Sequence, residues 1–169
     1  MTTTGIELMA RIEVRGRPAP QGSKKAFRHK HTGKIITQEM SKYVDPWRSD
    51  VRAAAIHFLS RTDRTRFPLD GPLSVDMVFS MPRPKGHYGT GRNAGTLKLS
   101  APLYPQGMPD LSKLVRSTED ALTSAGLWKD DSRVVEYGRL AKVYVGSDDP
   151  DALSCTGAVI RVRVKEVAR

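Results

Sequence analysis

One segment, residues 109–131, constrains the fold of this chain more than any other: PDLSKLVRSTEDALTSAGLWKDD. Its apolar and small residues recur at three- and four-residue spacing, which predicts one buried face of a helix. Asp110 is suited to cap the start of this helix, since Asp is among the best N-caps, and Gly126 is suited to end it. Leu127 and Trp128 then return the chain to the core. The rest of the chain is expected to pack around this helix.

The opposite face of the predicted helix mixes carboxylates with cations. At about 100° per residue it collects Asp110, Lys113, Arg116, Ser117 and Asp120. Asp130 and Asp131 follow the helix at the mouth of a predicted strand, where they can converge with Asp110. Carboxylates around one point, with Lys or Arg beside them, are what a hard cation such as Mg2+ needs for phosphoryl chemistry. The alternative is that Asp110 is only a cap, the Asp pair only a turn, and the cations only solvated.

The pattern PDLxKLxRxxxDALxxAGxWxDDxxVV, within residues 109–137, resembles the RusA family of Holliday-junction resolvases. That resemblance implies a small, dimeric endonuclease that uses Mg2+, or Mn2+ in its place, to cut four-way DNA junctions. It implies that Asp110 and Asp131 bind the metal and that Asp130 lies beside them. Asp120 matches the Asp of the family's Asp-Ala-Leu and would support the site, and Arg116 stands at the catalytic Lys.

Two positions depart from the family pattern. Ser112 stands where the family has its second metal-binding Asp, so we expect weaker metal affinity because one charged oxygen ligand is missing. Arg116 keeps a positive charge but differs from an ammonium in geometry, and Lys113 would share its role at the scissile phosphate. A protein that binds junctions or DNA with weakened or lost catalysis is therefore an alternative, and a basic RNA-binding module is a third.

The charge of the chain favours a polyanionic partner. The 169 residues carry 28 Lys and Arg against 18 Asp and Glu, a formal net charge of +10. Two basic segments, residues 22–34 and 82–109, contain no acid and read as loops. The predicted DNA-contacting side chains are Lys24, Lys25, Arg28, Lys30, Lys34, Arg83, Lys85, Arg92 and Lys98. Phe27 and Tyr88 are available for stacking. Solvated loops are the alternative.

The remaining elements predict an α+β fold in a single domain spanning residues 1–169, with a mixed, largely antiparallel sheet and two main helices. Strands are expected over residues 9–17, 73–81, 133–145 and 157–167, and a basic hairpin resumes near Ile35. A second helix is expected to start with Asp45 as its cap. The last two strands are predicted to pair as an antiparallel hairpin. Their acidic connection, with Asp148, Asp149 and Asp151, is expected to be a solvated turn.

Nothing in the sequence indicates secretion or a membrane. The single cysteine cannot form an internal disulfide, no apolar stretch reaches the length of a membrane span, and the N-terminal residues lack the layout of a signal peptide. We therefore expect a cytoplasmic protein of bacterial, prophage or phage origin. A symmetric junction needs two cuts, so a homodimer with two sites is the natural assembly.

Overall fold

A four-stranded sheet forms the centre of the computed structural model, which describes residues 5–22, 24–39 and 42–165. Its strands, in spatial order, are β1 (Ile6–Arg15), β6 (Gly157–Lys165), β4 (Leu73–Met81) and β5 (Val134–Tyr144). β6 runs antiparallel to both β1 and β4, whereas β4 and β5 are parallel. The predicted α+β class, with its mixed sheet and two main helices, is confirmed.

The predicted pairing of the last two strands is wrong. β4 lies between β5 and β6 and pairs with both. All nine residues of β4 are buried, so this strand needs a neighbour on each edge. A parallel β4–β5 pair requires a long crossover, and residues 82–133, which contain the helix Leu111–Ala125, supply it. Alternation along a strand indicates which face is buried but does not identify the neighbouring strands.

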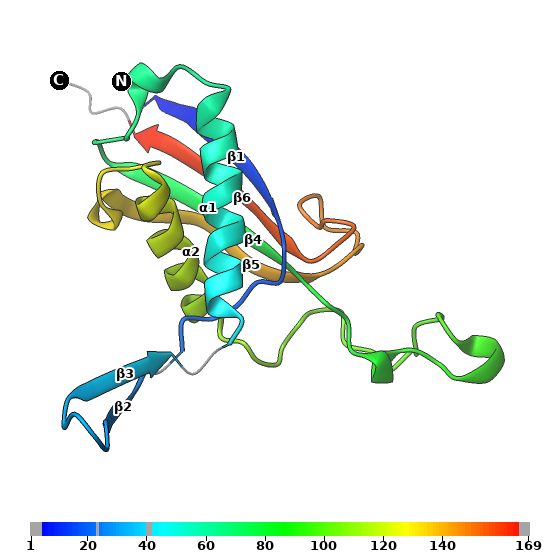
Figure 1. Ribbon diagram of the computed structural model, residues 1–169. Helices are drawn as coiled ribbons and strands as arrows, with labels where there is room; N and C mark the ends of the chain where they lie inside the picture. Colours follow the sequence, from blue (N-terminus) through cyan, green and yellow to red (C-terminus); the bar gives the residue numbers. More distant parts are fainter. Residues whose placement is uncertain (1–4, 23, 40–41, 166–169) are drawn as a thin grey trace.

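Helices α1 (Val44–Ser60) and α2 (Leu111–Ala125) cover one face of the sheet (Figure 1). Trp47 of α1 is fully buried against Phe79 of β4, with ring centroids 6.4 Å apart. Its indole Nε1 donates a hydrogen bond of 3.1 Å to the Thr118 hydroxyl, which joins α1 to α2. Leu114 is also fully buried, and a side chain of this kind contributes roughly 1.5–3 kcal/mol when it leaves water.

The helix ends agree only partly with the sequence pattern. Gly126 ends α2 in the left-handed conformation (φ 79°), as predicted. α1, however, begins at Val44, with Tyr43 as its N-cap residue, so the prediction that Asp45 caps it is wrong. Asp45 lies instead in the first turn, where its negative charge is favourable beside the free backbone N–H groups.

The acidic connection between β5 and β6 is not the solvated turn that its composition predicts. Asp151 is buried, and its two carboxylate oxygens accept hydrogen bonds of 2.6 and 2.9 Å from Arg161. Asp149 pairs with Arg139 of β5. Arg139 belongs to β5 and Arg161 to β6. Their ion pairs hold the connection against the sheet, because buried carboxylates need charged partners. Asp148 is exposed, as expected.

Two arms extend from the body at the end where α2 begins (Figure 1). The hairpin arm consists of β2 (Lys24–Arg28) and β3 (Ile35–Glu39), an antiparallel pair that confirms the predicted hairpin. The loop arm, residues 82–108, contains the short 3-10 turns η2 (Lys85–His87) and η3 (Gly91–Asn93). Within the described residues, no helix combines the length and the hydropathy that a membrane span requires.

Candidate functional site

Asp110 lies at the junction between the loop arm and α2. It is the N-cap residue of α2, but its side chain makes no capping hydrogen bond. Its carboxylate instead pairs with Lys113 at 3.0 Å, and about half of the Asp110 side chain is exposed. Lys142 of β5 donates hydrogen bonds of 2.7 and 2.8 Å to the carbonyls of Gly107 and Pro109. The chain is thus fixed just before Asp110, and the carboxylate faces solvent beside a cation.

Ser112 and Arg116 are both exposed on α2, one helical turn apart. Of the predicted polar face, Asp110 and Arg116 are exposed, and Lys113 and Asp120 are partly exposed. Ser117, which the pattern places on the same face, is fully buried, so that assignment is wrong. Its small hydroxyl fits against the body because its single O–H is shared between the carbonyls of Ala19 (2.6 Å) and Leu114 (3.0 Å).

Asp130 and Asp131 stand at the other end of α2 and have different surroundings. The Asp130 carboxylate accepts a hydrogen bond of 2.9 Å from the Ser132 backbone N–H, and hydrogen bonds from Ser132 lower the pKa of Asp130. Asp130 therefore caps the turn η4 (Asp131–Arg133), in agreement with the alternative interpretation of the Asp pair as a turn. Asp131 is exposed and opens that turn.

Glu119 is a carboxylate of α2 for which the sequence pattern predicts no role. The Tyr137 hydroxyl of β5 donates a hydrogen bond of 2.5 Å to it. Burial raises the pKa of Glu119. The hydrogen bond from Tyr137 opposes this shift, and the negative charges of Asp131 and Asp120 add to it. Burial and the Glu119 carboxylate likewise raise the pKa of Tyr137. The sequence signal that could have identified Glu119 is its position on α2. It follows the buried Val115 by four residues and therefore lies at the edge of the apolar face.

The structure does not bring the predicted metal ligands into one group. Asp110 is the N-cap residue of α2 and Asp131 opens the turn that follows the helix, so the 15 residues of α2 separate them along the chain. Asp120 is held by Arg48 of α1 at 3.0 Å and ties the two helices together. Residues 5–22, 24–39 and 42–165 contain no group of three or more His, Cys, Asp or Glu placed to hold a metal ion. The described residues of a single chain thus do not fit the expected cation site.

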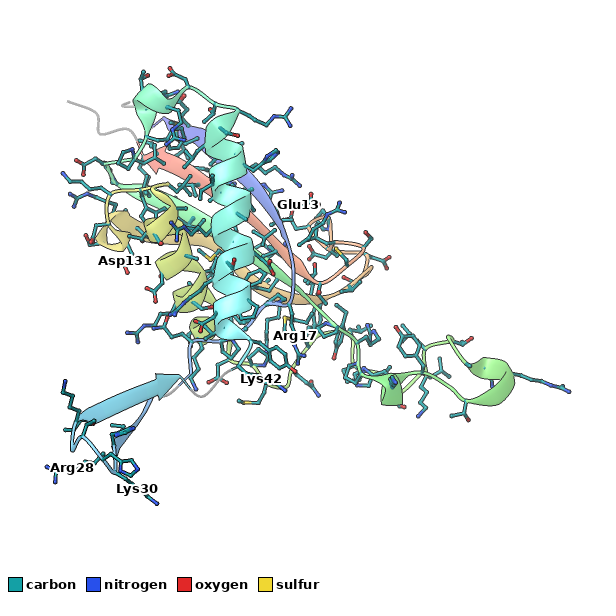
Figure 2. The ribbon with its side chains drawn as sticks, viewed as in Figure 1. Glu13, Arg17, Arg28, Lys30, Lys42 and Asp131 are labelled. Carbon is teal, nitrogen blue, oxygen red and sulfur yellow. The ribbon has the colours of Figure 1, made fainter. Side chains whose placement is uncertain are left out.

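The predicted DNA-contacting residues divide between the two arms. Those with exposed side chains are Arg28, Lys30, Lys34, Lys85, Arg92 and Lys98. Figure 2 shows Arg28 and Lys30 at the tip of the hairpin arm. Arg83 is half-buried over the Tyr144 ring, 3.8 Å from its centroid, and donates a hydrogen bond to the Pro102 carbonyl. The side chains of Lys24, Lys25 and Phe27 lie outside the described part of the structure.

Together these features define a class of protein. A basic chain with an exposed carboxylate and cations at one helix end, flanked there by two basic arms, has the layout of a small protein that acts on nucleic acid. Comparison with known protein families matches residues 16–150 to "Endodeoxyribonuclease RusA". Because the match spans most of the chain, this protein belongs to the RusA endodeoxyribonuclease family, and the resemblance found in residues 109–137 is confirmed. A search of curated proteins gives no significant match.

Proposed function

We propose that this protein is a Mg2+-dependent endonuclease that resolves four-way DNA junctions by paired hydrolysis of phosphodiester bonds. The observation that carries this proposal is the family match over residues 16–150. The position of Asp110 supports it, because this carboxylate stands where both basic arms leave the body. Arms of this charge would hold the phosphates of the strands around the branch point. The protein would work in bacterial or phage DNA processing in the cytoplasm.

Asp110 and Asp131 are the proposed metal ligands, with Asp130 beside them and Ser112 as a weak or water-mediated ligand. A divalent cation, Mg2+ or Mn2+, would supply Lewis acidity and an activated water when bound. Lys113 and Arg116 would offset negative charge on the scissile phosphate. Lys113 already contacts Asp110 at 3.0 Å, so its ammonium is held beside that carboxylate.

The proposed assembly is a homodimer. A junction with twofold symmetry presents two equivalent phosphates, which two copies of one site can cut as a pair. The separation of Asp110 from the Asp131 end of α2 gives a second reason. Since the described residues of one chain do not gather three carboxylates, a site built from both copies, with Asp110 of one near Asp131 of the other, would supply the missing ligands.

Two variants test the site and its assembly together. Asp110→Asn and Asp131→Asn are each expected to abolish cleavage of a labelled synthetic junction in Mg2+ and to leave junction binding intact or tighter, because a negative charge facing the phosphates is removed. Cleavage that persisted in either variant would contradict the assignment.

Mixing the two inactive variants then tests the shared site. If each site takes Asp110 from one copy and Asp131 from the other, a mixed dimer regains one intact site and makes single nicks. If both ligands come from the same copy, every site in the mixture keeps one defect and no cleavage returns.

The second candidate function is a junction-binding protein of the same fold with weakened or lost catalysis, and Ser112 is the observation that favours it. Ser112→Asp restores the carboxylate at an exposed position of α2. We expect this variant to lower the Mg2+ concentration that gives half-maximal cleavage by about tenfold, since a charged oxygen ligand is added. Ser112→Asn, which adds similar bulk without charge, is the control and should behave like the wild type. Cleavage that appears only in Ser112→Asp would favour the binding protein over the enzyme.

A further inference from the structure

A cavity of about 530 Å³ lies at the roots of the two arms, next to Asp110. Its wall includes Arg17 and Pro20, which lead into the hairpin arm, and Pro82, which opens the loop arm. Pro109, the neighbour of Asp110, closes another side. Figure 2 shows Arg17 and Lys42 in the region between the two arms. The volume falls in the range of small-ligand pockets, roughly 300–1,000 Å³.

The lining has flat apolar faces and positive charge. Seven of its residues are prolines and two are tyrosines. Arg17 and Lys142 contribute cations, and no Asp or Glu of the described residues lines the cavity. Such a wall disfavours a cationic ligand and favours a flat one that carries an anionic group.

The two tyrosine rings are held in place by stacked cations. The Arg17 guanidinium lies 4.0 Å from the centroid of the Tyr43 ring, and that of Arg83 lies 3.8 Å from the Tyr144 ring. His87 contacts Tyr144 edge-on, with centroids 5.8 Å apart. These contacts fix the rings before any ligand enters, which reduces the entropic cost of binding.

We propose that this cavity receives an unstacked nucleobase of the bound DNA, from a nucleotide next to the phosphate that faces Asp110. The inference rests on the proposed function and adds a base-binding subsite to it. The faces of a base would pack on the proline rings and on the stacked pair of Arg17 and Tyr43, and its phosphate would remain near Arg17 and Lys142. An apolar side chain of a protein partner would gain nothing from these cations.

The free energy of base binding favours a nucleotide whose base pair is already broken. Unstacking a paired base costs a few kcal/mol, and the cost is smallest where pairing is already broken, as at a branch point. Stacking on an aromatic side chain returns about 1–3 kcal/mol per base. The cavity is therefore expected to select a nucleotide near the branch rather than one within a duplex arm.

Two glycine-to-leucine variants test the cavity. One adds a side chain at the cavity wall, and the other, the control, makes the same change elsewhere on the loop arm. Gly107 lines the cavity, whereas Gly86 lies elsewhere on the loop arm. A Cβ added at either glycine meets no atom within 4 Å, so both variants should fold. Gly107→Leu places a side chain at the cavity wall, and Gly86→Leu makes the same change away from it. Tyr43→Leu removes one stacking ring without filling the space.

The probe is 2-aminopurine, a base that fluoresces when it leaves the stack, placed in turn at each position near the branch point of a synthetic junction. The full-length protein is added to saturation without divalent metal, and anisotropy reports binding in the same samples. Wild type and Gly86→Leu should raise the fluorescence several-fold at one position, and Gly107→Leu and Tyr43→Leu should abolish most of that rise.

The inference is overturned if bound wild type raises the fluorescence at no position, or if Gly107→Leu keeps the full rise. Failure of the proposed function gives a different result, namely anisotropy that shows no preference for the junction over a linear duplex. The same scan on a single-stranded oligonucleotide then tests the cavity by itself, with the same two overturning outcomes.

Discussion

Ser117 shows how a single polar residue can be misplaced by a helical pattern. Its position on α2 assigns it to the solvent face, yet its side chain is fully buried. The hydroxyl solves this conflict by donating to the carbonyl of Ala19, a residue that is itself only 1% exposed. This hydrogen bond attaches the segment before the hairpin arm to α2. The Ala19 carbonyl depends on it because water has little access to that carbonyl.

Removing this hydroxyl should therefore destabilise the protein. Ser117→Ala leaves the Ala19 carbonyl without the hydrogen bond, and we expect the free energy of unfolding to fall by about 1–3 kcal/mol. Urea denaturation followed by circular dichroism measures the change. Ser112→Ala, an exposed serine on the same helix, is the control and should stay within about 0.5 kcal/mol of the wild type. Equal effects in the two variants would contradict the role given to Ser117.

At the scale of elements, the sequence predicts what depends on near neighbours along the chain. The apolar face and the Gly126 end of α2, the extent of β4 and the hairpin arm all follow from periodicity and turn residues. Strand neighbours do not, because alternation is the same whichever strand lies alongside. The sequence pattern therefore pairs β5 and β6 with each other, whereas both pair with β4 in the structure.

The candidate site has the same division. The location of Asp110 at the start of α2 and of Asp131 after its end could be predicted from local signals. The contact of Glu119 with Tyr137 could not, because it joins α2 to a strand whose position depends on β4. The described residues of one chain contain no group of three carboxylates placed to hold a metal ion, and under the proposed homodimer Asp110 and Asp131 would meet across two copies, which local spacing does not encode.

The connection between β5 and β6 should make stability depend on pH. Arg161 holds the pKa of Asp151 below its usual value of 3.8. A carboxylate with a lowered folded-state pKa stabilises the protein above the unfolded value, and that contribution is lost as the pH falls through the folded-state pKa. The effect of Asp151 on stability should therefore be complete at pH 7 and decline below about pH 4.

Asp151→Asn tests this expectation. The variant leaves the half-buried Arg161 without its carboxylate partner, and we expect the free energy of unfolding at pH 7 to fall by about 2–3 kcal/mol. The difference from wild type should shrink as the pH is lowered below about 4, where the native Asp151 also becomes protonated. Asp148→Asn, at an exposed position of the same connection, should change little. A deficit that did not depend on pH would exclude the ion pair as its cause.

At the scale of the whole molecule, the net charge of +10 is distributed in a way that composition alone does not reveal. Both arms extend from the end of the body at which α2 begins, while the far end of α1 points away from them (Figure 1). Arg28 and Lys30 lie exposed at the tip of the hairpin arm. Charge on the arms is therefore expected to affect DNA binding more than equal charge at the far end of α1.

The salt dependence of binding tests this difference. Each bound phosphate releases counterions, so the slope of log affinity against log salt should become shallower by about 0.9 for each phosphate that the variant no longer binds. Arg28→Gln combined with Lys30→Gln should reduce the slope and weaken binding of a metal-free junction at fixed salt. Arg61→Gln combined with Arg64→Gln removes the same charge from exposed positions at the far end of α1 and should leave the slope nearly unchanged. If both pairs reduce the slope equally, the arms act only through net charge, and the hairpin arm does not contact the phosphates.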